Sequence, residues 1–207
     1  MFADFNWVEW MTNSPIFLVL IACSIVTLAV AAERAWYFAQ RRGDSDTLLE
    51  NSLRWIRKGE MNEAGRELES ASHPAGAVAA RLFESDEVIG QPADERLQVS
   101  LSEQKMLLEK NLGVLGTMAA VAPLIGLLGT IWGIMRAFHS MSLTGSTSPS
   151  VVASGVAEAL LTTAAGIMIA VPAILLYNHY TRRMNVMLTV AENCARSVRA
   201  AILETAK

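Results

Sequence analysis

Residues 159–181 read ALLTTAAGIMIAVPAILLYNHYT, a run of 23 residues without a charged side chain. Residues 10–32 form a second uncharged run of 23 residues, and residues 111–135 form a third of 25. A helix needs about 20 apolar residues to cross the hydrocarbon core of a membrane. Buried helices of soluble proteins rarely run that far without a charge. The sequence, which is 52% hydrophobic, therefore predicts an all-α membrane protein with three transmembrane helices.

The basic residues indicate how the chain is oriented in the membrane. The segment before the first run has no Lys or Arg, and residues 136–158 have one. Residues 33–110 have 11, and the tail 182–207 has five. Because Lys and Arg concentrate on the cytoplasmic side, we expect an external N-terminus and a cytoplasmic C-terminus. A cleaved signal peptide is not expected, since its positive charges would precede the apolar run.

Short helices in water are predicted between the first two runs. Asp44 or Asp46 can cap a helix that ends at Gly59. A second helix is predicted over residues 61–70, and Pro74 suits the first turn of a third.

Two longer helices are predicted to join this segment to the membrane. Leucines recur at helical spacing from Leu97 to Leu115, so one uninterrupted helix is expected from Ala93 into the second run. Ser148 followed by Pro149 is a helix-start signal. From there the pattern continues to about residue 205, which predicts a helix of about 85 Å.

These observations divide the chain into seven segments. The transmembrane helices are predicted at residues 14–32, 111–139 and 150–180. The other segments are a short external N-terminus (1–13), a cytoplasmic helical domain (33–110), an external loop (140–149) and a cytoplasmic C-terminal helix (181–207).

Small residues gather in the second run. Gly129 and Gly133 form a GxxxG pair, and Gly126 extends it. Small residues let helix backbones approach closely in lipid, which favours a tightly packed oligomer. The alternative is that Gly is simply commoner in membrane helices.

Glu158 directly precedes the third run, and two interpretations of it are open. If the helix starts at Pro149, Glu158 lies well inside it. An ionisable side chain at membrane depth is costly and usually marks an ion path. If the helix instead enters the lipid only at Ala159, Glu158 is an exposed acid in the first turn, favoured by the helix dipole.

Hydroxyl side chains occur in both of the later runs. Thr130 lies near the middle of the second and Thr163 in the third, and the two could face one polar path. A Thr in a membrane helix usually bonds to the carbonyl four residues back, which is the plainer interpretation of each. Glu158 and Thr163 are about 140° apart around a helix, so they cannot point to the same place.

Two stretches resemble a known family. Residues 123–138, PLIGLLGTIWGIMRAF, and residues 152–178, VASGVAEALLTTAAGIMIAVPAILLYN, resemble the two signature spans of ExbB and TolQ, and more distantly MotA. MotA has four spans and lacks the Glu-Ala-Leu run, so the resemblance is closer to ExbB and TolQ. The matching pattern also includes these residues: Glu33, Arg34, Glu158, Thr163, Gly166, Pro172, Tyr177 and Asn178.

The resemblance implies a ring-forming subunit of a proton-driven motor in the bacterial inner membrane, with a periplasmic N-terminus. A homopentamer would surround two copies of a single-span partner of the ExbD or TolR type. That partner would supply the Asp that takes up and releases the proton. A TonB- or TolA-type protein is a further expected partner, and TonB-dependent uptake is the expected output.

The resemblance also implies roles for individual residues. Thr130 and Thr163 match the pore-lining threonines of the family, and Glu158 matches its functional glutamate in the third span. Five residues are assigned to helix packing: Gly126, Gly129, Gly133, Gly166 and Pro172.

Other functions stay open or are disfavoured. A TolQ-like subunit, a gliding-motility subunit and a passive scaffold are alternatives; only a scaffold would tolerate apolar replacement of Glu158 and both threonines. The sequence has no G-x-x-x-x-G-K-[ST], no H-E-x-x-H and no nucleophile elbow. Its two cysteines are isolated. We therefore expect no enzymatic activity, catalytic residue, cofactor, metal site or nucleic-acid partner.

Overall fold

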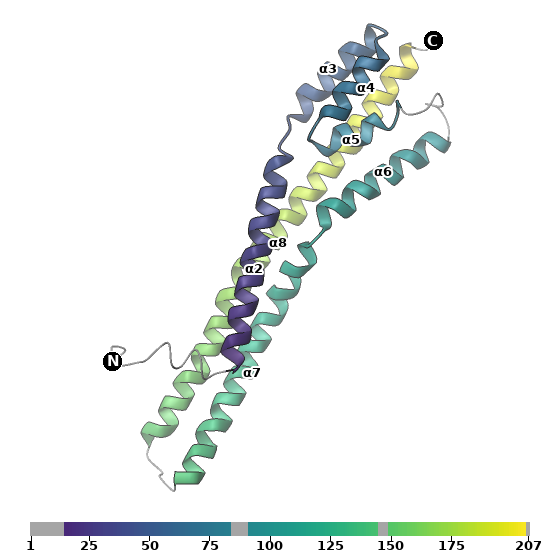
Figure 1. The fold of residues 1–207 in the computed structure, drawn as a ribbon. Helices are drawn as coiled ribbons and strands as arrows, with labels where there is room; N and C mark the ends of the chain where they lie inside the picture. The colour runs from purple at the N-terminus through teal and green to yellow at the C-terminus, as the bar shows by residue number, and fades with distance from the viewer. Residues whose placement is uncertain (1–14, 84–90, 145–148, 206–207) are drawn as a thin grey trace. The chain divides into compact units, whose positions relative to one another are not determined.

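The computed structural model describes residues 15–83, 91–144 and 149–205, and these contain helices and no strand (Figure 1). The predicted N-terminal segment and the centre of the predicted external loop lie outside the described residues. Contacts divide the chain into two units. The first comprises residues 1–32 and 111–178, and the second comprises residues 33–110 and 179–207.

The first unit is formed by three long helices, two of which continue into the second unit. They are α2 (Pro15–Gln40), α7 (Leu112–Thr144) and α8 (Pro149–Thr205). Each is long and apolar enough to cross a membrane. Many of their large apolar side chains are exposed, among them Leu124 and Met168, as expected of surfaces that face lipid. The predicted all-α fold with three transmembrane helices is therefore confirmed.

Helix α8 is continuous over 57 residues. It begins at Pro149 and ends at Thr205, so the long third helix predicted from the start signal is confirmed. Pro172 lies inside this helix. Proline is tolerated in membrane helices because neighbouring groups can satisfy the backbone that it frees.

The prediction of one uninterrupted helix from Ala93 into the second apolar run is wrong. Helix α6 (Gln91–Glu109) ends before α7 begins at Leu112. Between them Asn111 has a φ of 63°, in the left-handed region. Asn enters this region more readily than most residues with a side chain. The leucine pattern crosses the break because residues on both sides of it are buried, and periodicity does not reveal the φ of one residue.

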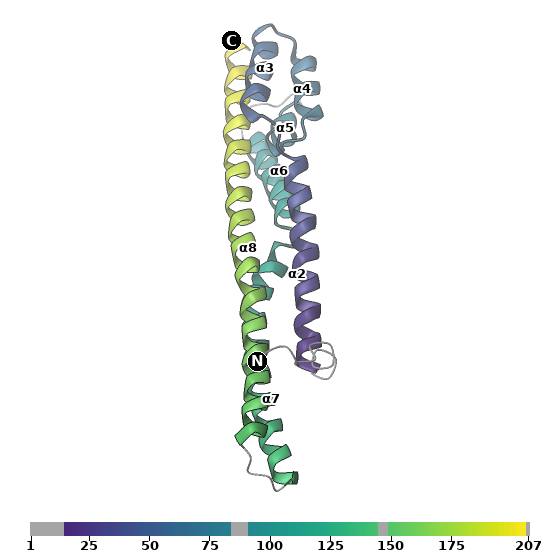
Figure 2. The same ribbon diagram turned by 90° about the vertical axis from the view of Figure 1, so that its left-hand side faces the viewer.

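The second unit is a small helical domain. It contains the end of α2, α3 (Ser45–Arg57), α4 (Met61–Ser70), α5 (Pro74–Ala80), α6 and the last part of α8. Its core is formed by apolar residues of several helices, including Ile56, Leu68, Val78 and Val198. The short side helices α3, α4 and α5 are visible in Figure 2.

The predicted boundaries of these short helices are confirmed. Asp44 caps α3, because its carboxylate accepts hydrogen bonds from the backbone N–H groups of Asp46 and Thr47. Gly59, which follows α3, has a φ of 81°, a conformation that glycine adopts without strain. The next helix covers residues 61–70 as predicted.

Arg34 is the most buried charged side chain described in the second unit, with 1% of its surface exposed. Its Nε donates to the Glu33 carboxylate at 2.6 Å and its Nη1 to the Leu108 carbonyl at 3.5 Å. The guanidinium also lies 4.4 Å from the ring centroid of Tyr37. A buried charge is stable only when it is paired and hydrogen-bonded, so the Glu33–Arg34 pair has a structural role in this fold.

Candidate functional site

Helices α7 and α8 pack against each other in antiparallel directions (Figure 1). A Cβ atom added to Gly133 would lie 2.9 Å from the Cβ of Ala159, and one added to Gly166 would lie 2.5 Å from the Ala122 carbonyl oxygen. Residues later in α7 thus contact residues earlier in α8. The absence of side chains at these glycines is what allows the two backbones to approach so closely.

Two glycines of α7 lie against a pair of threonines in α8. A Cβ atom on Gly126 would be 3.0 Å from the Cα of Thr163, and one on Gly129 would be 2.7 Å from the Cβ of Thr162. These are contacts within one chain. The packing role that we assigned to the glycines in an oligomer therefore stays a prediction.

The two threonines of α8 converge on one carbonyl of α7. The Thr163 hydroxyl donates to the Gly126 carbonyl at 3.0 Å. The Thr162 hydroxyl lies 3.3 Å from the same oxygen and 2.7 Å from the Ala159 carbonyl of its own helix. Thr162 is only 2% exposed, whereas Thr163 is half-buried. Thr162 is thus a packing residue between the helices, and Thr163 is the more accessible hydroxyl.

Thr130 is half-buried and bonds within its own helix. Its hydroxyl donates to the carbonyl of Leu127 at 2.6 Å. The two hydroxyls predicted to face one path, those of Thr130 and Thr163, therefore donate to adjacent carbonyls of α7 and not to each other. Pro172, which we assigned to packing, is exposed in the single chain.

Glu158 lies opposite Arg136 across the two helices. Its Oε1 is 3.9 Å from Nη1 of Arg136, and the side chains are 28% and 54% exposed, respectively. Because α8 starts at Pro149, Glu158 is not in the first turn of its helix. This excludes the interpretation of Glu158 as an acid in the first turn of its helix. The depth of Glu158 in a membrane stays a prediction.

The pair borders an open groove of about 450 Å³ between α7 and α8. Its lining consists of these residues: Gly133, Arg136, Ala137, Ser140, Ser154, Gly155 and Glu158. The groove is polar mainly because of the ion pair and the two serines. It is open enough for the carboxylate of Glu158 to be reached from outside the chain.

Sequence reasoning did not single out Arg136, which served only to mark the end of an uncharged run. A signal was nevertheless present. The second run ends at Arg136 and the third begins after Glu158. In an antiparallel pair of helices joined by a short connection, those two positions lie at the same level. The contact of Thr162 with Gly129 could not be predicted from the sequence in this way, because it depends on the rotation of each helix about its own axis.

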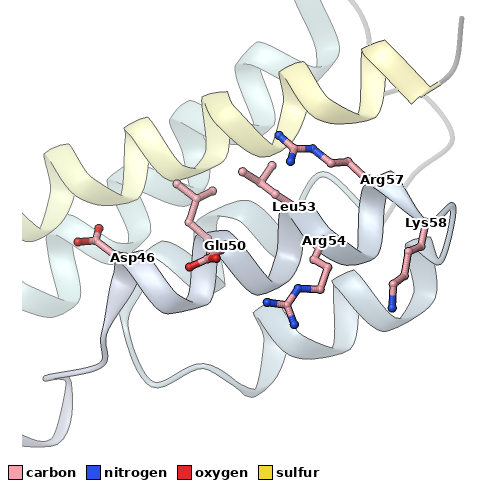
Figure 3. Close-up of a pocket in the computed structure, with 7 residues that line it drawn as sticks. Asp46, Glu50, Leu53, Arg54, Arg57 and Lys58 are labelled. Atoms are coloured by element: carbon pink, nitrogen blue, oxygen red, sulfur yellow. The ribbon is translucent and has the colours of Figure 1, made fainter.

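A second groove, of about 550 Å³, follows α3 in the second unit (Figure 3). The lining residues Asp46 and Glu50 lie toward the N-terminal end of α3, and Arg54, Arg57 and Lys58 lie toward its C-terminal end. This distribution of charge is the one that the helix dipole favours. The charges that line this groove are therefore explained by their effect on the stability of α3.

Metal-binding chemistry has no support in the described part of the chain, where no three His, Cys, Asp or Glu side chains gather to hold an ion. Cys194 is buried, and this burial raises the pKa of its thiol to about 11. A thiol with such a pKa is unreactive at neutral pH.

Fold and site together define a helical membrane protein in which the paired helices α7 and α8 carry a carboxylate, an arginine and two accessible hydroxyls. The profile of the MotA/TolQ/ExbB proton channel family matches residues 66–193, which is more than half of the chain. The chain belongs to this family.

Individual relatives agree with this assignment. The biopolymer transport protein ExbB of Salmonella typhimurium is 36% identical over 124 residues, which cover 60% of this chain and 47% of that protein. The chain thus spans about half the length of that relative. The Tol-Pal system protein TolQ of Pseudomonas aeruginosa is 26% identical over 197 residues, covering 86% of this chain and 84% of TolQ. A putative ExbB-like protein of Synechocystis is 30% identical over 176 residues, covering 82% and 68%.

Proposed function

We propose that this chain is the ring-forming subunit of a proton-driven motor of the ExbB/TolQ type in the inner membrane. Five copies surround the transmembrane helices of two copies of a single-span ExbD- or TolR-type protein. Proton flow through this assembly drives relative rotation of ring and partner. The partner carries the work to the cell envelope, with TonB-dependent uptake as the favoured output.

One observation carries this proposal. The region matched to the proton channel family contains both α7 and most of α8, and in this helix pair Glu158, Thr130 and Thr163 are each half-exposed. A carboxyl group that gains and loses a proton is stabilised by hydroxyls that can hydrogen-bond to either form. Thr130 and Thr163 supply such hydroxyls to the Asp expected from the partner, and Glu158 supplies an ionisable group of the ring itself.

A TolQ-like function in envelope maintenance is the second candidate. It is supported by the longer match to TolQ, which covers 86% of this chain, whereas the match to Salmonella ExbB covers 60%. A gliding-type motor uses the same ring and differs only in its output. A passive scaffold would need the fold but none of the polar groups in the helix pair.

Purification from native membranes tests the proposed assembly. An affinity-tagged chain is extracted in a mild detergent, and the intact complex is weighed by native mass spectrometry. We expect five copies of the chain with two copies of a small protein that has one apolar span and a single Asp near its start. A monomer, or a ring that lacks such a protein, would contradict the proposal.

The same complex separates a motor from a scaffold. It is reconstituted into liposomes that contain a pH-sensitive dye, and proton uptake is followed after a pH step. Replacement of Glu158 by Gln should abolish most of the uptake while the complex keeps its mass. Unchanged uptake in this variant would favour the scaffold.

A further inference from the structure

We propose that Arg136 is the positioning residue of Glu158. Its guanidinium holds the carboxylate against α7 of the same chain, and loosening of this pair frees the carboxylate to act in the proton pathway. This inference rests on the proposed function, since it gives Arg136 a task in the same site.

The charges in the groove support this pairing. Arg136 and Glu158 face each other at 3.9 Å. The rest of the groove lining consists of two serines, two glycines and an alanine. Among the described residues that line it, Arg136 is therefore the one cation that opposes the Glu158 carboxylate. An ionisable side chain in a largely apolar helix pair usually has such a partner.

The local backbone explains why these two side chains can meet. Gly133 lies one turn before Arg136 in α7, and Gly155 lies three residues before Glu158 in α8. A Cβ atom on Gly155 would lie 2.5 Å from the Cβ of Ala137. The two helices are thus in contact beside the ion pair. The glycines also leave the groove free of bulky side chains, so both charged groups have room to move.

The geometry also indicates that the pair can be separated. A distance of 3.9 Å is at the long end for an ion pair, and more than half of the Arg136 side chain is exposed. Exposed pairs of this kind contribute little stability. The pair is thus strong enough to orient the carboxylate and weak enough to open when a partner helix offers Glu158 another contact. A carboxylate held by Arg136 is not free to contact a second chain at the same time.

Replacement of Arg136 tests the assignment in the complex purified from native membranes. The variants are Arg136→Gln, Arg136→Lys and the exchanged pair Arg136→Glu with Glu158→Arg. Arg196→Gln is the matched control, because Arg196 forms an exposed ion pair with Glu192 at 2.5 Å in the part of α8 that belongs to the second unit. Each variant is first checked by native mass spectrometry, so that only assembled complexes are compared.

Two measurements are made on each variant: proton uptake by liposomes, and the rate at which an apolar carbodiimide labels the acid of the pair, which is Glu158 or, in the exchanged pair, the glutamate introduced at position 136. The carbodiimide reacts with a neutral carboxylic acid and spares a carboxylate held in an ion pair. For Arg136→Gln we expect a several-fold loss of uptake, because the carboxylate is no longer held in position before it acts, and a several-fold faster labelling, because it is no longer paired. Arg136→Lys should restore both toward the native values, because it keeps the positive charge. The exchanged pair should assemble, and Arg196→Gln should match the native protein in both measurements.

The outcomes distinguish this inference from the proposed function. Native uptake and native labelling in Arg136→Gln would overturn the role of Arg136, even if Glu158→Gln abolishes uptake and so supports the motor. Native uptake in Glu158→Gln would instead count against the proposed function. If Arg136→Gln does not assemble, Arg136→Lys and the exchanged pair decide the question. Failure of both to restore labelling to the native rate would overturn the inference.

Discussion

Gly129 of α7 lies directly against Thr162 of α8, and a Cβ atom at Gly129 would be 2.7 Å from the Cβ of Thr162. Two carbon atoms cannot approach so closely, and the Cβ of Thr162 belongs to the rigid part of its side chain. Any side chain at position 129 would therefore force α7 and α8 apart. The register of this helix pair depends on that contact.

Gly129→Ala should destabilise the detergent-solubilised protein by about 1 to 3 kcal/mol, the usual cost of overpacking. Gly113→Ala is the matched control in the same helix, because a Cβ atom there would have no neighbour within 4 Å. At that position alanine should be neutral or stabilising, since it favours helix more than glycine does. Thermal unfolding followed by circular dichroism measures both. Equal effects of the two substitutions would contradict the close contact.

Asn111 should tolerate glycine better than a branched side chain. Its φ of 63° costs most residues about 1 to 2 kcal/mol, and a β-branched residue is a genuine outlier there. We expect Asn111→Val to lower the unfolding midpoint clearly, and Asn111→Gly to lower it less or not at all. If the valine variant is as stable as the glycine variant, the break between α6 and α7 is not as described.

His73 should make the second unit sensitive to acid. The Nδ1 atom of His73 accepts a hydrogen bond from the N–H of Ala75 at 3.1 Å and so caps α5. Burial lowers the pKa of His73, so the unfolded chain binds this proton more readily than the folded one. The free energy of unfolding should therefore fall as the pH drops below about 6.5, by at most about 1.4 kcal/mol per pH unit.

His73→Asn provides the comparison for this pH dependence. Asn keeps a capping oxygen but does not titrate, so the loss of stability between pH 7 and pH 5 should be smaller in the variant. The difference between the two curves of unfolding midpoint against pH isolates the histidine from the carboxylates. Parallel curves would show that His73 is not responsible.

Much of this fold could be predicted because its signals are local or periodic. The start of α8 at Pro149 follows from a cap and a proline, and its length follows from an unbroken pattern. The left-handed Asn111 was missed because the apolar pattern on both sides of it is the same as in one continuous helix. A single dihedral angle leaves no trace in periodicity.

The candidate site was less predictable than the fold. Glu158 stands out in a sequence because a charge beside an apolar run is rare. Its contact with Arg136, and the shared carbonyl of Thr162 and Thr163, depend on the rotation and register of two helices. Those quantities depend on how glycines pack against specific neighbours, which apolar periodicity and single-residue signals do not reveal.

The central claim is that the polar groups of the α7–α8 pair conduct protons, and Thr163 tests it most directly. Thr163 and Thr162 both reach the Gly126 carbonyl, at 3.0 and 3.3 Å, but only Thr163 is accessible. Valine replaces either hydroxyl with a methyl group of similar size. Thr162→Val is therefore a control for the loss of one interhelical hydrogen bond, which costs about 1 kcal/mol.

The decisive measurement is proton uptake by liposomes that contain the assembled complex. We predict that Thr163→Val loses most of the uptake with its complex intact, whereas Thr162→Val retains it. If Thr163→Val assembles and takes up protons at the native rate, the role assigned to this hydroxyl and the proposed pathway are wrong.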